Sequence, residues 1–400
     1  MLGTDFHDKE LVDHVNIFSF RLFCNAEYDQ HGVQQYRTWQ YNDESSLLIV
    51  LKLCRTSCLC FIMSCESSDP IAQSPSPPPE LKFKLPTTSD FDSELYGWSS
   101  DEIQSKLPTD ILLITANDHE FNACYSYMKH VQRGVCKKLG YVYFGQFGDQ
   151  NDPKVRVALM KCWQGPAAAL IAVKNAAEIL NPKVVLFVGI CASMKPTKAK
   201  LGDVVISAKL ATYDDKKIKE NGTVEHRGTK ANVSRNMARL ILNAADGWKP
   251  PLKDQNSLNV AVHRDAVMLS GSDSVDSLDI RQKLAKHFPD ALGLEMEGAG
   301  LLAAAYDIGM EWAVVKAVSD FADGSKEKTK HWQPFSSAMA ASVVYNMFKY
   351  PVVLEDWPHH KPNDVEAIPT TSRNDTKIGQ LDQNTEYKAK RPRTTQLEKL

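Results

Sequence analysis

Apolar runs of strand length alternate with segments of helical periodicity between about Pro108 and Tyr350 of this 400-residue chain. The predicted strands are nearly continuous in Val, Ile and Leu, which is typical of strands buried on both faces, and they cover 110–116, 155–162, 183–190, 203–208, 259–270 and 312–318. The predicted helices between and after them cover 121–133, 166–180, 231–245, 276–287, 298–307 and 335–349. This alternation predicts an α/β fold of three layers, α/β/α, with a mainly parallel, mixed central sheet.

Composition divides the chain into four parts. Residues 1–65 lack sustained periodicity, and we assign them no structure. Residues 66–107 begin with a Pro- and Ser-rich stretch that suits neither a helix nor a central strand, so we expect a linker and an approach segment. Residues 108–350 form the predicted α/β domain. Residues 351–400 are polar with few apolar side chains, which predicts a disordered polar and basic tail.

Charge and hydropathy favour neither nucleic acid nor a membrane as partner. The chain has 47 basic and 49 acidic residues, so no overall field attracts nucleic acid or an acidic membrane surface. The apolar stretch Leu47–Ser64 carries Lys52 and Arg55 near its centre, where each costs about 2.5–3.5 kcal/mol in a bilayer.

The N-terminus is acidic and polar, so we expect no signal peptide and a cytoplasmic protein. The basic segment Lys388–Arg393 is either a nuclear localisation signal or a solvated run of charge.

The cysteines also favour a reducing compartment. Their number, nine, is odd, and four fall in predicted helices or buried strands, which predicts reduced thiols: Cys124, Cys136, Cys162 and Cys191. A second group has no paired C-x-x-C spacing and no nearby His, so we expect no metal site there: Cys54, Cys58, Cys60 and Cys65.

Candidate functional residues follow predicted strands, at the edge of an α/β sheet where ligands bind. Glu120 follows the first strand in TANDHEF, Glu297 lies in EMEGAG, and Asp320 lies in VSDFADG. Gly189, in VGICASM, permits close approach of the backbone, and Cys191 is among the small residues after it. Each carboxylate alone is typical of a helix cap, but three at three strand ends suit acid–base and polyol-binding chemistry. No P-loop or G-x-G-x-x-G follows the first strand, which disfavours triphosphate and dinucleotide enzymes.

Together these segments resemble the nucleoside phosphorylase superfamily, and within it the branch of methylthioadenosine/S-adenosylhomocysteine nucleosidases and related purine nucleosidases. The matching motifs run in order from about Asp110 to Lys349: ITANDHEF, GPAAALIAV, VLFVGICASMKPTKAKLGDVVIS, SGSDSV, LGLEMEGAGLLAAA, VVKAVSDFADG and HWQPFSSAMAASVVY. The resemblance implies a nucleoside phosphorylase-like fold for 108–350, and a catalytic function for that domain.

The resemblance also implies two catalytic carboxyl groups. Glu120 matches the carboxylate that activates the attacking water. Ser319 and Asp320 match the pair of purine-specific members, in which the Asp protonates N7 of the leaving base. Such an Asp must be protonated in the complex, which needs an apolar or anionic setting, and Asp323 is a candidate for the nearby negative charge.

Two further positions are implied as substrate-binding. Met296 is expected to pack against the ribose, and Glu297 to accept hydrogen bonds from its hydroxyls. Gly189 and Cys191 are predicted to bind substrate because their loop permits close approach and leaves room for a ligand, and Ser319 is the fifth predicted substrate-binding residue.

Two departures from the family bear on the reaction. Phosphorolytic members carry Gly-Asp-Pro-x-Arg after the first strand and an Arg two residues before the loop glycine, whereas this chain has TANDHE and Phe187. Without these guanidinium groups phosphate lacks an evident bidentate partner, so water is favoured as nucleophile. Nucleosidases often place an aromatic residue in the segment SGSDSV to stack on the base. Here Ser274 and Val275 occupy that segment, so the sequence does not decide the affinity for the base or the identity of the substrate.

We therefore predict a purine nucleosidase that hydrolyses the N-glycosidic bond of adenosine-type nucleosides in catabolism or salvage. We expect a small-molecule purine nucleoside as substrate, a homo-oligomer, and no cofactor, metal, nucleic acid or membrane. Two alternatives remain, a phosphate-dependent phosphorylase and a non-catalytic nucleoside-sensing module of the same fold. Retention of all three carboxylates favours an enzyme, because a binding module does not need one that activates water.

Overall fold

The computed structural model describes residues 76–91, 94–148 and 154–359, and the backbone of five short strands nearer the N-terminus. These are β1 (Phe20–Phe23), β2 (Glu27–Tyr28), β3 (Gln34–Gln35), β4 (Thr38–Tyr41) and β5 (Met63–Ser64). β1 pairs antiparallel with β4 and β5, and β2 pairs with β3. Several segments named above lie outside the described residues: all four cysteines of the second group, the Leu47–Ser64 stretch except β5, the start of the Pro-rich segment, and the basic segment Lys388–Arg393.

A mixed eleven-stranded sheet forms the centre of the α/β domain, in the order β15-β12-β16-β17-β11-β7-β10-β9-β8-β6, with β18 paired to both β11 and β12. Its strands are β6 (Tyr96–Gly97), β7 (Ile111–Thr115), β8 (Lys129–Cys136), β9 (Gly140–Phe147), β10 (Val155–Lys161), β11 (Val184–Ser193), β12 (Val204–Thr212), β15 (Lys230–Asn232), β16 (Val262–Ser270), β17 (Ala291–Glu295) and β18 (Glu311–Asp320). In the centre of this sheet β10, β7, β11 and β18 run parallel to one another. β18 also pairs antiparallel with β12, so that β12, β16, β17, β11 and β18 form a closed ring of pairings. A separate hairpin joins β13 (Lys216–Ile218) and β14 (Val224–His226).

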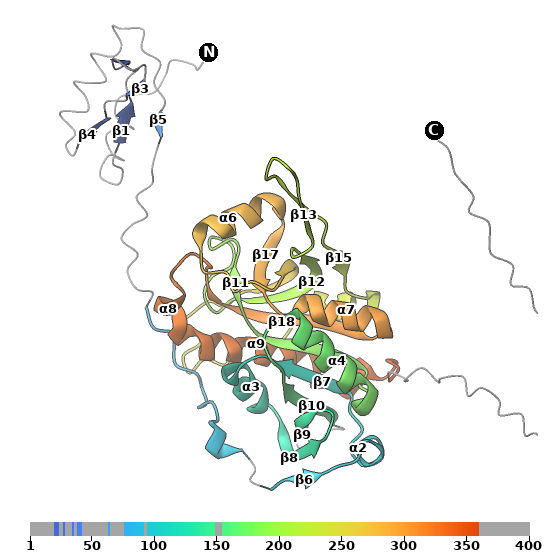
Figure 1. The fold of residues 1–400 in the computed structure, drawn as a ribbon. Helices are drawn as coiled ribbons and strands as arrows, with labels where there is room; N and C mark the ends of the chain where they lie inside the picture. Colours follow the sequence, from blue (N-terminus) through green and yellow to red (C-terminus); the bar gives the residue numbers. More distant parts are fainter. Residues whose placement is uncertain are drawn as a thin grey trace, which may run out of the picture. The chain divides into compact units, whose positions relative to one another are not determined.

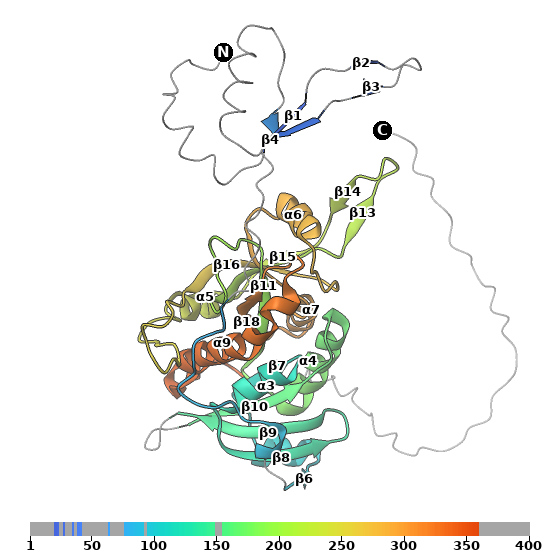
Figure 2. The same ribbon diagram turned by 90° about the vertical axis from the view of Figure 1, so that its left-hand side faces the viewer.

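Helices cover both sides of the sheet, which confirms the predicted three-layer α/β/α fold. Figure 2 shows β18 and β11 between α9 (Gln333–Phe348) on one side and α7 (Gly298–Ile308) with α4 (Pro166–Leu180) on the other. α3 (Asp118–Tyr125) packs against α9 and against β7, β10 and β11. α2 (Ser100–Lys106) packs against α4. The remaining described helices are α5 (Arg235–Leu242), α6 (Leu278–His287) and α8 (Lys326–Thr329).

The contact between α4 and α7, side by side in Figure 1, explains part of the sequence of both helices. α4 has the predicted bounds, with Pro166 in its first turn and Asn181 ending it in the left-handed region at φ 46°. A Cβ on Gly300 of α7 would lie 1.9 Å from the carbonyl oxygen of Pro166, which no side chain tolerates. Gly300 is therefore required for this close packing, which fixes the start of α4 beside the start of α7.

Two predicted helices are wrong in part. The expected helix 121–133 ends at Tyr125, and its second half is strand β8, which forms a hairpin with β9. β8 is exposed along much of its length, so its sequence lacks the continuous apolar run that identified the buried strands. The expected helix 231–245 is strand β15 followed by α5, which starts after Ser234, whose hydroxyl accepts a hydrogen bond from the backbone N–H of Met237.

Residues outside 108–350 also contact the domain. The Phe91 ring lies 5.4 Å from the ring of Phe121 between centroids, and the Trp332 indole N–H donates to the carbonyl of Ser76 at 3.1 Å. Beyond residue 350, Trp357 is buried. The boundaries at 108 and 350 stay a prediction, which truncation at each of them would test.

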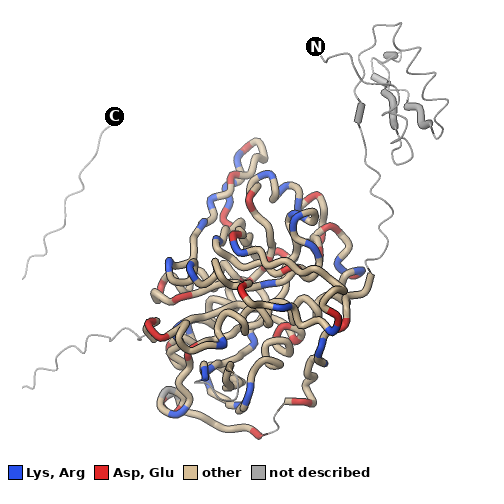
Figure 3. The backbone as a smooth tube through the Cα atoms, turned by 180° about the vertical axis from the view of Figure 1, so that it is seen from behind, with Lys and Arg blue, Asp and Glu red and all other residues tan. Residues whose placement is uncertain are grey.

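The described structure bears on the cysteines, the charges and the membrane, while the cellular compartment stays a prediction. The four cysteines Cys124, Cys136, Cys162 and Cys191 are free in the described structure. Basic and acidic residues are interspersed over the described chain (Figure 3), as the net charge of −2 leads one to expect. Among the described helices, none combines the length and the apolar character needed to cross a membrane.

Candidate active site

A cavity of about 400 Å³ opens where β7, β11, β17 and β18 end. Six of the predicted site residues line it: Glu120, Cys191, Met296, Glu297, Ser319 and Asp320. Ser274 and Val275, the residues that replace the expected aromatic, line it as well. The rule that ligand sites lie at the carboxyl ends of strands therefore located one shared cavity.

Glu120 is held in place by backbone groups from two segments. Asn117 caps α3 by accepting a hydrogen bond from the Glu120 N–H, and Oε2 of Glu120 accepts from the N–H groups of Ala116 (2.8 Å) and Asn117 (3.1 Å). Its Oε1 accepts from the N–H of Ile190 at 2.8 Å. A Cβ on Gly189 would lie 1.8 Å from this Oε1. Gly189, predicted to bind substrate, thus permits the approach of the Glu120 carboxylate, and Glu120 is both a helix cap and a cavity-lining group.

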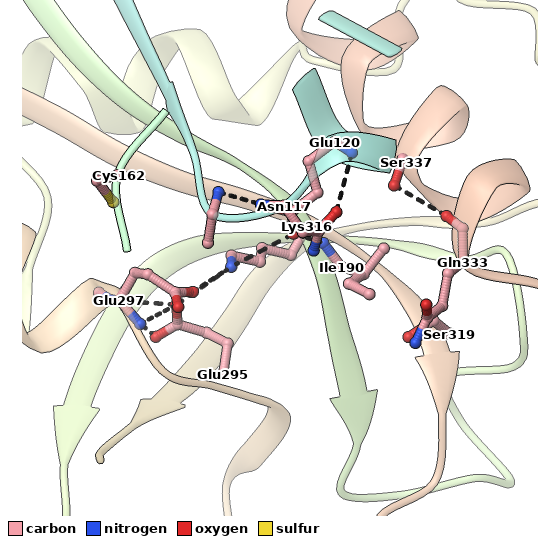
Figure 4. Close-up of polar contacts among 12 residues, drawn as sticks. Asn117, Glu120, Cys162, Ile190, Glu295, Glu297, Lys316, Ser319, Gln333 and Ser337 are labelled. Carbon is pink, nitrogen blue, oxygen red and sulfur yellow. Dashed lines mark hydrogen bonds and ion pairs between the residues drawn. The ribbon is translucent and has the colours of Figure 1, made fainter. Parts of the chain in front are cut away.

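A buried lysine lies among three buried carboxylates (Figure 4). The Nζ atom of Lys316 lies 2.6 Å from Oε2 of Glu297, 3.7 Å from Oε2 of Glu295 and 3.9 Å from Oε1 of Glu120. Burial alone lowers the pKa of Lys316, but the three carboxylates outweigh burial and raise that pKa above its ordinary value. Burial raises the pKa of Glu120 and of Glu295, and the charge of Lys316 opposes the rise. The three carboxyl groups thus share one cation.

Sequence reasoning missed Lys316 and Glu295. Lys316 is the one charged residue in the apolar run WAVVKAV, and a lysine inside a strand buried on both faces needs a charged partner. That signal was available in the sequence. Glu295 accepts hydrogen bonds from the N–H groups of Glu297 (2.9 Å) and Gly298 (2.9 Å), so it supplies the cap of α7 that was attributed to Glu297.

The Glu297 side chain is consequently directed to the cavity and to α4. It makes no side-chain cap bond at the start of α7, although it occupies the N-cap position. Its Oε1 accepts from the N–H of Gly165 at 3.2 Å, at the start of α4, while its Oε2 binds Lys316. The close contact of α4 with α7 thus positions this carboxylate.

Asp320 ends β18 in a different electrostatic setting. Its Oδ2 accepts from the hydroxyl of Ser319 at 3.1 Å, and its Oδ1 from the N–H of Ala322 at 3.1 Å. Burial raises the pKa of Asp320, and the negative charge of Asp276 adds to the rise.

The expectation that Asp323 supplies this negative charge is wrong. Asp323 lies 3.7 Å from the guanidinium of Arg281 and accepts hydrogen bonds from Ser325, so its charge is neutralised away from Asp320. Asp276 takes that place because the Gly324 N–H, at 2.8 Å, ties it to the loop after β18.

The side of the cavity near Asp320 also carries a cation. Nζ of Lys326 lies 3.1 Å from the hydroxyl of Ser274, and both residues line the cavity. Burial raises the pKa of Cys191, so this thiol is neutral and serves as a small wall residue. Phe187, at the position of a phosphorolytic arginine, is buried, with its ring centroid 5.8 Å from Nζ of Lys316.

Comparison with known proteins agrees with this architecture. The family model described as the phosphorylase superfamily matches residues 110–345, which include every residue that lines the cavity. The chain belongs to the phosphorylase superfamily. Its relatives include a death domain-containing ATP nucleosidase from Amphimedon queenslandica, 33% identical over 252 residues, which are 58% of this chain and 47% of that protein. A 5′-methylthioadenosine/S-adenosylhomocysteine nucleosidase from Staphylococcus epidermidis is 24% identical over 174 residues, 43% of this chain and 71% of that protein.

The match thus spans about half of the length of the Amphimedon protein. A solved structure of S-adenosylhomocysteine nucleosidase from Streptococcus pyogenes, in complex with 5-methylthiotubericidin, superposes with a TM-score of 0.50 at 17% identity. That superposition covers 61% of this chain and 98% of the Streptococcus chain. At this identity the likeness concerns the fold, and it confirms the predicted nucleoside phosphorylase-like architecture.

Proposed function

We propose that this chain is a purine nucleosidase that hydrolyses the N-glycosidic bond of adenosine-type substrates. The observation that carries the proposal is the convergence of Glu120, Glu297 and Asp320 on one cavity, with Lys316 joining the first two. The names of both relatives support the substrate class, because ATP, methylthioadenosine and S-adenosylhomocysteine share the adenosine group. The homo-oligomer and the cytoplasmic location stay predictions.

The three carboxyl groups suit the three demands of the reaction. Cleavage of a glycosidic bond passes through an oxocarbenium-like state, which needs a protonated leaving group, an activated water and a held sugar. The raised pKa of Asp320 keeps its carboxyl protonated to higher pH than an ordinary aspartic acid, so it can donate to N7. The raised pKa of Glu120 makes its carboxylate a stronger base toward water. Glu297, whose Oε2 accepts a hydrogen bond from Nζ of Lys316 at 2.6 Å, accepts hydrogen bonds from the ribose hydroxyls.

Water is favoured over phosphate as the nucleophile. Among the described residues that line the cavity, none is arginine, and its two lysines are Lys316 and Lys326. Lys316 is bound by carboxylates, and Lys326 by Ser274. The surplus of carboxylates around Lys316 repels an incoming anion. A phosphorylase would have to overcome this repulsion without a bidentate partner.

The same arrangement disfavours a non-catalytic sensing module. Burying Glu120 raises its pKa and opposes its ionisation, which is a cost that nucleoside binding alone does not require.

The pH dependence of base release tests the assignment of acid and base. We expect kcat/KM for adenine release from adenosine to be bell-shaped. Activity rises as Glu120 loses its proton, and falls as Asp320 loses its own. Because both pKa values are raised, both limbs lie at higher pH than ordinary carboxyl groups would give.

The measurement is the initial rate of base release, followed by chromatography, with adenosine, inosine and guanosine as substrates. No release of base from any of them at any pH would contradict a purine nucleosidase. Release from inosine or guanosine but not adenosine would contradict the adenosine-type substrate.

A further inference from the structure

The assigned roles fix how a nucleoside is oriented in the cavity. Asp320 faces N7 of the base, and Glu297 faces the ribose hydroxyls. The C5′ atom of a nucleoside lies at the end of the ribose away from the base. Its substituent therefore faces the part of the cavity wall beyond Glu297, on the side away from Asp320.

We assign to that part of the wall the residue that caps α3, the first two residues of α3 and the residue before Gly165. We call it the 5′ rim, and it consists of Asn117, Asp118, His119 and Gln164. Gln164 precedes Gly165, whose N–H binds Glu297, so the rim begins directly beside the ribose carboxylate. Asp118, His119 and Gln164 are exposed, and Asp118 holds Nζ of Lys161 at 2.5 Å.

All four side chains of the 5′ rim are polar. The apolar lining residues lie mostly elsewhere: Ile190, Cys191 and Ala192 on β11, Leu294 near the end of β17, Met296 beside Glu297, and Val275, whereas Ala116 precedes Asn117 with a side chain of a single methyl group. An apolar substituent at C5′ would displace water from the polar rim without replacing its hydrogen bonds. A substituent that bears oxygen would accept hydrogen bonds from the amide of Gln164 and from the adjacent cationic Lys161.

We infer that this site takes adenosine-type substrates whose 5′ substituent bears oxygen, a hydroxyl or a phosphate ester, and that it discriminates against 5′-alkylthio nucleosides. The inference rests on the proposed function for the orientation of the ligand. One relative is named for ATP and the other for a methylthio nucleoside, and the inference narrows the proposed adenosine-type substrates to those with the oxygen-bearing 5′ group.

The full chain is assayed for adenine release from adenosine, ATP and 5′-methylthioadenosine at matched concentrations. We expect kcat/KM for adenosine or for ATP to exceed that for methylthioadenosine by at least about tenfold. Gln164→Leu is expected to shift the ratio of methylthioadenosine to adenosine about tenfold toward the thioether. Gln333→Leu is the matched control, because Gln333 lines the same cavity beside Ser319 (Figure 4), on the side of the base that all three substrates share. It is expected to leave that ratio within about twofold.

Lys161→Met tells the two oxygen-bearing groups apart. If Lys161→Met loses activity on ATP and keeps its activity on adenosine, the inference is supported and the preferred 5′ substituent is a phosphate ester. If the protein prefers adenosine and Lys161→Met does not change that preference, the inference is supported and the preferred 5′ substituent is a hydroxyl. Preference of the unaltered chain for methylthioadenosine, or an unchanged ratio in Gln164→Leu, would overturn it. If no substrate releases adenine, the proposed function fails, and calorimetric binding then decides the inference. Tighter binding of adenosine or ATP than of methylthioadenosine supports it, and the reverse overturns it.

Discussion

Asp320→Asn is expected to release purine base about 10²–10⁴ times more slowly than the unaltered protein, with a much smaller change in substrate binding. Asparagine has nearly the same shape, and its amide oxygen still accepts the hydrogen bond from the Ala322 N–H. It has no acidic proton to give to N7, so the loss falls on the step in which the leaving group departs. The measurement is kcat and KM for base release, together with the pH profile, whose fall at high pH should disappear.

Glu297→Gln provides the contrast. Its amide weakens both the contact with Lys316 and the acceptance of two ribose hydroxyls, so both kcat and KM are expected to worsen. A nucleoside whose leaving group needs no protonation should restore much of the rate of Asp320→Asn and little of the rate of Glu297→Gln. Near-normal turnover of a purine nucleoside by Asp320→Asn would show that Asp320 is a structural anchor of the loop after β18.

Lys316→Met is expected to lower the free energy of unfolding by about 3–5 kcal/mol near neutral pH. Methionine fills a similar volume but leaves Glu120, Glu295 and Glu297 buried without their shared cation. In the folded variant Glu120 and Glu295 lose the cation that opposes the rise of their pKa values, so these values lie further above those of the unfolded chain. Their protonated forms are therefore favoured in the folded state, and the deficit in stability should shrink as pH falls and grow as pH rises. Urea unfolding at several pH values measures this dependence.

Lys326→Met is the matched control, because Lys326 lines the same cavity, is only partly buried and binds the hydroxyl of Ser274. It is expected to change stability by less than about 1 kcal/mol. The double variant Lys316→Met with Glu297→Gln should regain part of the stability lost by Lys316→Met alone, since it buries one charge fewer. A deficit independent of pH and not reduced in the double variant would mean that Lys316 stabilises the fold by packing alone.

The parts of the fold that the sequence predicted well are those buried on both faces or ended by a distinct residue. β7 and β11 carry apolar runs, β18 carries one that only Lys316 interrupts, and α4 begins at Pro166 and ends at Leu180 as expected. The hairpin of β8 and β9 was missed because β8 has one exposed side and no such run. Tertiary pairing with β9 decides its conformation, and that pairing leaves little trace in local sequence.

Within the site, the sequence predicted which residues line the cavity better than it predicted which of them contact one another. Glu120 and Asp320 were found because each follows a strand, which is a local feature. The group around Lys316 joins residues from α3, β17, the start of α7 and β18, and only the folded sheet brings these together. For the same reason, proximity in sequence pointed to Asp323, whereas in the structure the charge that raises the pKa of Asp320 is that of Asp276. Gly189 was found correctly as a position of close approach, but the group that approaches it is Glu120.

The identity of the sugar product, measured with and without phosphate, tests the central claim most directly. We expect the purified full chain to release adenine from an adenosine-type substrate in phosphate-free buffer, with free ribose or its 5′-substituted form as the second product. Added phosphate should not raise the rate, because no arginine among the described cavity-lining residues is present to bind it. Appearance of the corresponding ribose 1-phosphate, with a rate that rises in proportion to phosphate, would contradict hydrolysis and identify a phosphorylase.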